Sequence, residues 1–303
     1  MVISGGRTSI SFAAVISCLL VAQASGLYVG FYAASCPNAE SIILETLKPF
    51  LASDPTLGGP LLRISYHDCF VRVVNGNVAE KDAPGPNLNS VRGYEVYDGI
   101  KAALESSCPG VVSCADIVQI VSRDVTVLDG GPYWDVQTGR RDGLISIAAE
   151  AQANLVGPDS DYDTQKNAFA NKGLSEKDLV VLTGKRLSSS HGVQGQTDPS
   201  LDVSFARELK ATCPSGSSNS LEMDGTQFKF DTRYFKRLQV HKGLFGSDAS
   251  LITQPFPASV VEEETHKDSF YADFPESMLR LAALDVLTGS DGEIRKNCAF
   301  VNS

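Results

Sequence analysis

Arg63 and His67 are the residues whose types and spacing most directly suggest chemistry in this sequence. An imidazole titrates near neutral pH, so His67 could take a proton from a substrate such as a peroxide and return it to a departing oxygen. An arginine keeps its charge, so Arg63 could stabilise the anion that develops as the bond breaks. Taken alone, such a pair is also compatible with a purely structural helix face, and the spacing by itself leaves both interpretations open.

The elements that must position this pair are predicted to be helices. Pro60 opens a segment in which Arg63 and His67 stand at positions i and i+4, so both project from one helix face. Alternating strand patterns are scarce, and the fold class is therefore expected to be all-α. Further helices are expected from Pro37 to Asp54, around Tyr97–Leu104, Ile117–Leu128, Tyr162–Ala170 and Glu176–Leu182, and in a last long segment around Phe274–Leu281.

The net charge and the distribution of apolar residues argue against some kinds of binding partner and indicate where the protein is located. The net charge of −10 argues against a nucleic-acid partner or an anionic membrane, because both require clustered positive charge. Residues 1–25 resemble a signal peptide, with a cleavage site near Ala22-Gln23-Ala24; a buried N-terminal helix is the alternative. No later segment has about 18 uninterrupted apolar residues. We therefore expect a secreted, soluble protein with a single domain over residues 26–303.

Six cysteines follow the predicted signal peptide, at positions 36, 69, 108, 114, 213 and 298. In an oxidising compartment an even number suggests disulfides, but sequence alone leaves 15 pairings open. No Cys-x-x-Cys pair occurs, so a zinc module is not expected.

Longer runs of sequence are similar to class III secretory plant peroxidases. The similarity covers roughly residues 27–302 and includes the motif around Arg63 and His67. Other family-like runs are Phe31–Glu40, Glu80–Ala83, Arg92–Tyr94, Cys108–Ile117, Gly130–Trp134, Gly139–Gly143, Gly243–Asp248 and Gly292–Cys298. The sequence departs from the family pattern at two abrupt gaps, after Arg72 and after Gly184.

This resemblance implies the plant haem peroxidase fold, in which haem b lies between two helical lobes. The distal lobe would span about residues 26–160 plus the C-terminal helix, and the proximal lobe about residues 161–275. The expected cofactors are haem b and two Ca²⁺ ions, and the expected substrates are hydrogen peroxide and small phenolic donors. The implied roles are peroxide removal, the response to oxidative stress and cell-wall phenol oxidation. We expect a plant monomer in the extracellular space or cell wall, with the vacuole as an alternative.

The resemblance also assigns roles on the distal side. His67 would be the acid–base residue, Arg63 would stabilise the peroxide transition state, and Asn87 would orient His67 by a hydrogen bond. Tyr66 stands where the family usually has phenylalanine. Family pairing implies disulfides Cys36–Cys108 and Cys114–Cys298. Cys69 and Cys213 lack their usual partners; we expect free thiols, with a Cys69–Cys213 bond as the alternative.

Two calcium sites are implied, each with an incomplete ligand set. The distal site would use Asp68, Val71 and Glu80, but the family's intervening ligand stretch is missing. The proximal site would use Asp224, Thr226, the carbonyl of Lys229, and Asp231. Calcium requires 6–8 oxygen ligands, so further donors would be needed at both sites.

The proximal side lacks the family's iron-binding histidine. Arg186 occupies the ungapped position, and a guanidinium has no lone pair to offer a metal. Asp248, the residue that normally hydrogen-bonds the proximal imidazole, is retained and is expected to have lost its partner. His191 could replace the missing ligand or could be a surface-loop histidine.

Three interpretations follow from these departures. The protein could be a working peroxidase, or a catalytically impaired secreted relative that lacks the axial ligand. The third possibility is that the two gaps come from wrongly assigned exon boundaries or aberrant splicing, and that the natural product is complete.

Overall fold

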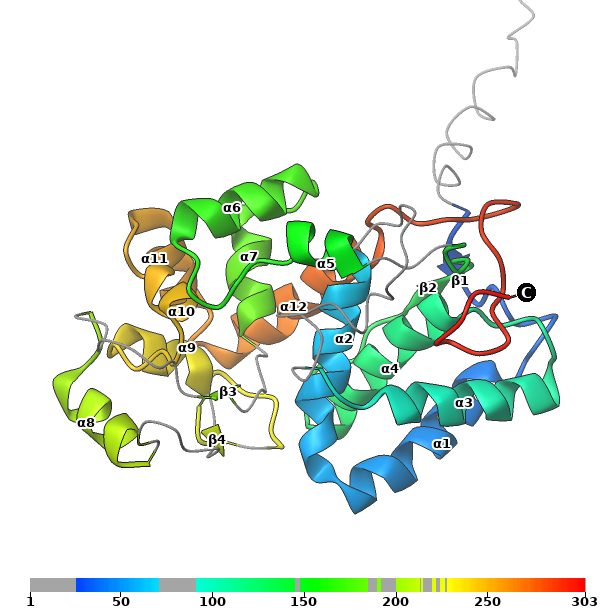
Figure 1. Cartoon of the computed structure of the whole chain (residues 1–303), viewed down its shortest axis with the longest axis horizontal. Coiled ribbons are helices and arrows are strands. Elements are labelled where there is room, and N and C mark those ends of the chain that lie inside the picture. The colour runs from blue at the N-terminus through cyan, green and yellow to red at the C-terminus, as the bar shows by residue number, and fades with distance from the viewer. Residues whose placement is uncertain are drawn as a thin grey trace, which may run out of the picture.

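A computed structural model describes residues 26–70, 91–144, 148–184, 190–191, 200–212, 214, 220–221, 224–226 and 228–302. Helices dominate these residues (Figure 1). The first group contains α1 (Ala39–Ser53), the 3₁₀ helix η1 (Pro55–Leu57), α2 (Gly58–Phe70), α3 (Tyr94–Ser107) and α4 (Cys114–Leu128). They are followed by α5 (Ala148–Asn154), α6 (Tyr162–Asn171), α7 (Glu176–Thr183), α8 (Val203–Thr212), α9 (Arg233–Gln239), α10 (Gly246–Ser250), α11 (Pro255–Glu263) and α12 (Lys267–Ala282). The prediction of an all-α fold is confirmed.

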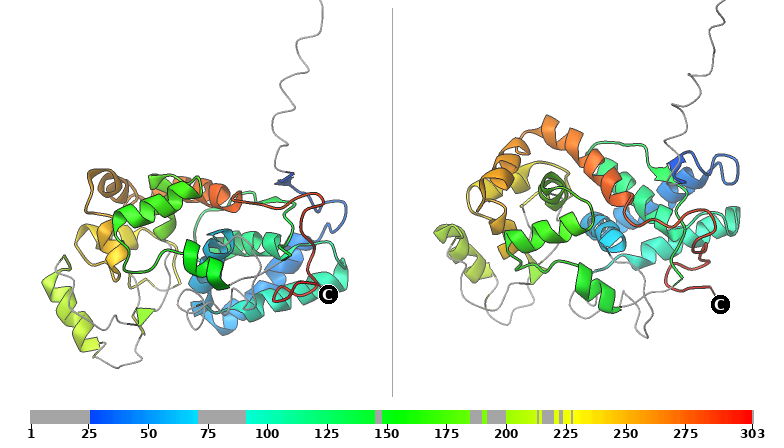
Figure 2. Two further views of the ribbon diagram at one scale, coloured as in Figure 1. Left: turned by 45° about the horizontal axis from the view of Figure 1, so that its top comes forward. Right: turned by 90° about the horizontal axis from the view of Figure 1, so that it is seen from above.

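The helices form two groups joined through α12. On one side α2 packs on α4, and α1 packs on α3 and α4. On the other side α7 contacts α6 and α11, and α11 also contacts α9. The long α12 contacts both α7 and α2, so it links the two groups, as the two turned views in Figure 2 show.

The helix that carries Arg63 and His67 begins earlier than predicted. Its expected start was Pro60, but α2 begins at Gly58, directly after η1. Pro60 is tolerated there because the N–H groups of a first helical turn have no intrahelical partner. Asp54 caps η1, the short helix before α2, by accepting a hydrogen bond from the backbone N–H of Thr56 at 2.9 Å.

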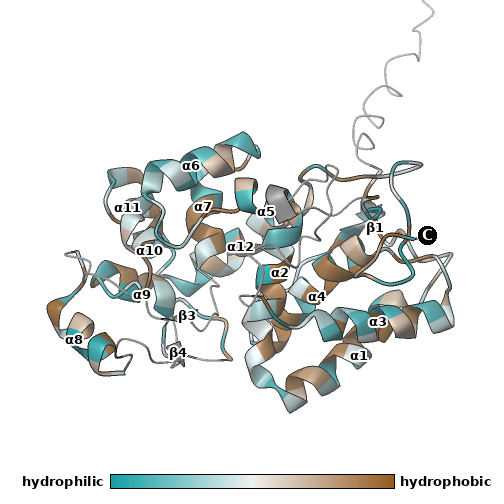
Figure 3. Ribbon diagram, viewed as in Figure 1, coloured by the Kyte–Doolittle hydropathy of each residue, from teal (hydrophilic) through white to brown (hydrophobic). Residues whose placement is uncertain are grey.

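The central helix of the first group is α4, which is buried along nearly its whole length. Its first turn is capped by Ser113, whose side chain accepts from the Asp116 N–H at 3.1 Å. After its end, a Cβ on Gly131 would lie 2.8 Å from the Thr126 carbonyl oxygen and 2.7 Å from Phe230. Only glycine allows this close approach. Figure 3 shows long hydrophobic stretches on α4 and α7.

Aromatic rings fill the core of the second group. Phe230 stacks on Phe270 with ring centroids 4.8 Å apart, and Phe274 meets Phe230 edge-on at the same distance. Trp134 reaches the same cluster through Phe274, at 6.0 Å. Because Trp134 follows α4 and Phe274 belongs to α12, these contacts join the two groups through apolar burial.

A buried polar network fixes the short antiparallel pair β1 (Tyr28–Val29) and β2 (Gln137–Thr138) beside α4. The Asp116 carboxylate accepts from Tyr32 at 2.7 Å and from the Arg140 guanidinium at 2.8 Å. All three groups are buried, and each buried charge has its partner, as burial requires. A second pair, β3 (Ser190–His191) with β4 (Ser220–Leu221), lies in the other half.

Both implied disulfides, Cys36–Cys108 and Cys114–Cys298, are present. Cys69 carries a free thiol, so it is not bonded to Cys213, which lies outside the described residues. The predicted signal peptide also lies outside them. Among the described residues, no helix is long and apolar enough to cross a bilayer.

The first four predicted long helices, the two around Tyr162 and Glu176 and the last one are all found. The sequence prediction missed α5, α8, α9, α10 and α11, as well as the four two-residue strands. Strands of two residues are too short to show an alternating pattern.

Candidate functional site

Arg63 and His67 converge on one point of the α2 surface. The Arg63 Nε–H donates a hydrogen bond to His67 Nε2 over 3.0 Å. Both side chains are half-buried, so they can be reached by solvent or a small ligand. The structure thus brings together the two residues that the sequence singled out.

The opposite face of α2 packs against α4, so Arg63 and His67 point away from that helix contact. Ser65 Oγ donates to Gln119 Oε1 of α4 at 3.2 Å, and Gln119 Nε2 donates to Cys69 Sγ at 3.4 Å. Ser65 and Cys69 lie roughly half a helical turn around from Arg63 and His67. Enclosure by protein, and then the charge of Asp68, raise the pKa of the Cys69 thiol to about 12. This cysteine is therefore a packing residue rather than a nucleophile.

Tyr66 connects the Arg63–His67 pair to the second group of helices. Its ring lies edge-on to the His67 imidazole with centroids 5.8 Å apart. It also stacks on Phe169 of α6 with centroids 6.1 Å apart and an interplanar angle of 21°. The hydroxylated ring at this position therefore forms an aromatic wall that bridges α2 and α6.

Asp248 has a hydrogen-bond partner, contrary to the expectation from sequence. Its carboxylate is completely buried and accepts from the Tyr234 hydroxyl of α9 at 2.8 Å. The same carboxylate accepts from the backbone N–H groups of Leu244 and Phe245, at 3.2 and 3.0 Å. A phenol and two amides thus satisfy a group that would otherwise be a costly buried charge. No local spacing in the sequence could have identified Tyr234.

The described residues provide no axial nitrogen next to Asp248. Helix α7 is closed by Gly184, where a Cβ would lie 2.3 Å from the Phe235 ring, so the chain runs tightly against α9. Arg186 lies outside the described residues, and only the backbone of His191 is described, in β3. His241 and His266 are exposed. The absence of an axial histidine therefore stays a prediction, because the segment where it would lie is outside the described residues.

The proposed proximal calcium ligands lie close together. Thr226 donates its backbone N–H to Asp224 at 2.9 Å and its hydroxyl to Asp231 at 3.3 Å. Lys229 N–H in turn donates to the Thr226 carbonyl at 3.2 Å, which holds the loop in one turn. Asp224 is buried, whereas the Lys229 side chain is exposed. These hydrogen bonds hold the side chains of Asp224, Thr226 and Asp231 close together; the role of the Lys229 carbonyl stays a prediction.

The predicted distal calcium ligands are only partly visible. Asp68 lies on α2 with an exposed side chain. Val71 and Glu80 lie outside the described residues, as does Asn87, the residue expected to orient His67. These three assignments remain predictions.

Comparison with known proteins finds peroxidases over most of the chain. A family model described as Peroxidase matches residues 43–267. Peroxidase 56 of Arabidopsis thaliana is 42% identical over 318 aligned positions, covering 96% of this chain and 96% of the relative. Peroxidase 27 of the same plant is 43% identical, covering 95% and 98% of the two chains. Peroxidase 1 of Oryza sativa subsp. japonica is 40% identical, covering 93% and 95%.

Proposed function

The chain belongs to the class III plant peroxidase family, whose members use hydrogen peroxide to oxidise substrates, and we propose that His67 and Arg63 carry out the peroxide step in this protein. The observation that carries the proposal is the 3.0 Å contact between Arg63 Nε and His67 Nε2, which places a proton acceptor beside a permanent positive charge.

The two residues would divide the work. Hydrogen peroxide displaces the Arg63 contact, and His67 Nε2 takes a proton from one peroxide oxygen. His67 then returns the proton to the other oxygen as it leaves as water, while Arg63 stabilises the negative charge on that oxygen. Asn87 is proposed to orient the imidazole. In the overall reaction, peroxide gains two electrons and two protons to give two waters, and two phenol molecules each supply one electron and one proton.

Haem, when bound, would supply the redox chemistry of the reaction. Arg63 and His67 would face its distal side, with Tyr66 as an aromatic wall. We assign no axial ligand among the described residues; His191 is retained as a candidate and Arg186 is excluded by its chemistry. The proposed calcium ligands are Asp68, Val71 and Glu80 at one site and Asp224, Thr226, Lys229 and Asp231 at the other.

We also propose that the electron donors are small neutral or cationic phenols and that the protein is secreted. The net charge of −10 suits small neutral or cationic phenols better than anionic donors. The N-terminal signal-like segment and two disulfides support secretion to the cell wall or extracellular space.

A second candidate function is favoured by one observation. The Asp248 carboxylate is already satisfied by Tyr234 and two backbone N–H groups. A chain with this arrangement could be a catalytically impaired relative that binds haem weakly, or the product of a transcript that has lost the ligand segment. Sequencing transcripts across Arg72–Val73 and Gly184–Lys185 separates the last possibility from the others.

The peroxide step can be tested with haem-loaded protein in a single-turnover reaction with hydrogen peroxide. His67→Ala should lower the second-order rate constant by about 10²-fold or more, because the proton acceptor is lost. His266→Ala, which alters an exposed histidine, should leave the rate constant unchanged. Equal rate constants for the protein and its His67→Ala variant would remove the assignment of His67.

A further inference from the structure

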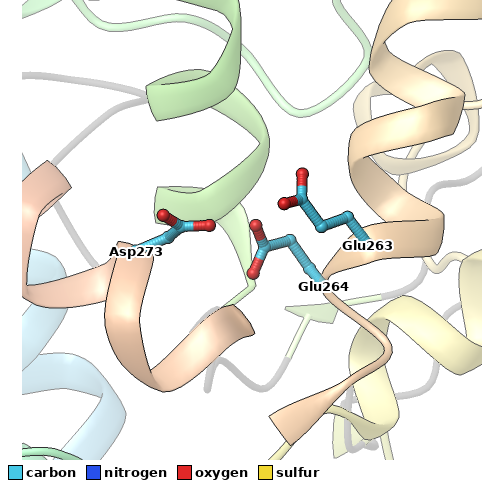
Figure 4. Close-up of side chains that lie close together, drawn as sticks. All are labelled: Glu263, Glu264 and Asp273. Atoms are coloured by element: carbon cyan, nitrogen blue, oxygen red, sulfur yellow. The ribbon is translucent and has the colours of Figure 1, made fainter. Parts of the chain in front are cut away.

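Three carboxylates come together where α11 ends and α12 passes beside it. Glu263 is the last residue of α11, Glu264 caps that helix, and Asp273 lies on α12. One oxygen from each residue lies within 4.8 Å of the other two. Figure 4 shows the Glu264 carboxylate between those of Asp273 and Glu263. None of these residues belongs to the peroxidase site or to the two proposed calcium sites described above.

Glu264 is the unusual member of this acidic cluster. Its side chain has no exposed area, and neither carboxylate oxygen has a hydrogen-bond donor. The neighbouring carboxylate of Asp273 lies within hydrogen-bonding reach. Two ionised carboxylates are both acceptors and cannot bond to each other. A proton or a cation must therefore lie between them, because an uncompensated buried carboxylate is costly.

Lys177 of α7 provides only part of the compensating charge. Its Nζ lies 2.7 Å from Asp273 and 3.4 Å from Glu263, so the ammonium serves the two partly exposed acids. Three carboxylates and one ammonium leave a net charge of −2 on the group. One divalent cation would neutralise that charge, whereas one shared proton would leave −1.

We propose that Glu263, Glu264 and Asp273 bind a hard divalent cation, and that Ca²⁺ is the ion that fits them. The donors are all carboxylate oxygens, which hard cations prefer over softer transition metals. Ca–O bonds of about 2.3–2.6 Å allow ligands on opposite sides of the ion to lie nearly 5 Å apart, as the 4.8 Å spread permits. Glu263 and Asp273 are partly exposed, so water can complete the coordination on that side.

The proposed ion would act on the fold rather than on the peroxide chemistry. It would tie the end of α11 to α12, the helix that also contacts α7 and α2. In the absence of an ion, burial and then the neighbouring Asp273 raise the pKa of Glu264 to about 8. A proton shared between the two carboxylates is therefore the alternative to a bound cation. The proposal does not depend on the proposed peroxide step.

Calcium stoichiometry of the full chain tests this inference. Equilibrium dialysis against radioactive calcium should show one bound ion fewer per chain for Glu264→Gln than for the unaltered protein. The matched control is Glu262→Gln, which removes an exposed neighbouring carboxylate outside the cluster and should retain the full number of ions. An unchanged stoichiometry in Glu264→Gln would overturn the site.

Thermal unfolding distinguishes the lost ligand from a damaged fold. In EDTA, Glu264→Gln should unfold at the same temperature as the unaltered chain or at a higher one, because a buried carboxyl that must take up a proton on folding is replaced by an uncharged amide. Added calcium should raise the midpoint of the unaltered chain and of Glu262→Gln by more than that of Glu264→Gln. Equal calcium-induced shifts in all three proteins would overturn the site; a midpoint in EDTA that falls as the pH rises from about 4.5 to about 8, and is level above that, would show that a proton fills the gap instead.

Discussion

The carboxylate of Asp178, a buried acid of the second helix group, accepts hydrogen bonds at both of its oxygens. It is 1% exposed, and it accepts from Arg280 Nε at 2.8 Å and Ser277 Oγ at 2.7 Å. Its second oxygen accepts from the backbone N–H and the hydroxyl of Ser175, which caps α7. Burial alone would raise the pKa of Asp178, but these donors outweigh burial and lower it. One residue thereby joins the start of α7 to α12.

Asp178→Asn should lower the free energy of unfolding by about 2–3 kcal/mol at neutral pH, because charge-assisted hydrogen bonds are lost. The folded-state pKa lies below the unfolded value of about 3.9, so this stability is fully present above that pH. It is lost as the pH falls through the folded-state value. Urea unfolding between about pH 7 and about pH 3 should show the two proteins converging on the acid side. A difference that widens in acid would contradict this assignment.

For single residues, the sequence predicted which side chains share a helix face better than it predicted their tertiary hydrogen-bond partners. Arg63 and His67 were predicted to share a helix face, and they do. The partnership of Asp248 with Tyr234, fourteen residues earlier in the chain, could not be predicted, because it depends on how α9 and α10 pack. The unpartnered Glu264 has the same origin, since α12 brings Asp273 to it.

Among the elements, α4 shows most clearly how local sequence positions the site. It supports α2, which carries Arg63 and His67, and its N-terminus is capped by the buried Ser113. Loss of the cap leaves one helix N–H without a partner.

Ser113→Ala should therefore cost about 1 kcal/mol of stability. The matched control is Ser106→Ala, on the exposed side of α3, where the serine hydroxyl only donates back to the Ala102 carbonyl. This control should change the stability by less than about 0.5 kcal/mol. Chemical denaturation of the three proteins measures both effects, and equal losses in the two variants would contradict a capping role for Ser113.

Element prediction succeeded where an apolar stripe was long. The helices α1, α3, α4 and α12 each have 14–16 residues and were all predicted. The missed helices, α5 and α8 to α11, have only 5–10 residues, so they contain too few turns for a periodic pattern to stand out. Tertiary packing, rather than local preference, stabilises helices of this length.

At the scale of the whole molecule, two disulfides connect distant parts of the chain. Cys36–Cys108 closes a loop with a sequence separation of 72, and Cys114–Cys298 closes one of 184. A crosslink limits the freedom of the unfolded chain more when its loop is longer. The second bond also fixes the C-terminal segment to the start of α4.

Replacing both Cys114 and Cys298 by serine should lower the free energy of unfolding by about 5 kcal/mol. The corresponding replacement of Cys36 and Cys108 should cost about 0.8 kcal/mol less, because its loop is shorter. Urea unfolding of the two double variants, each compared with the unaltered chain, gives both numbers. A larger loss for the shorter loop would contradict the loop-entropy explanation.

The family is assigned by similarity along most of the chain, and the fold agrees with it. The state of the proximal side stays a prediction, because residues 185–189 and 192–199 lie outside the described part of the chain. Arg63 and His67 are hydrogen-bonded to each other on α2, and we propose that this pair gives the chain its peroxidase activity.

The most direct measurement is oxidation of a phenol such as guaiacol by hydrogen peroxide with the purified full-length chain loaded with haem and calcium. We expect a coloured protein whose turnover clearly exceeds that of the same concentration of free haem. Turnover no faster than free haem, by protein that is folded and saturated with haem, would contradict the central claim and favour the impaired relative.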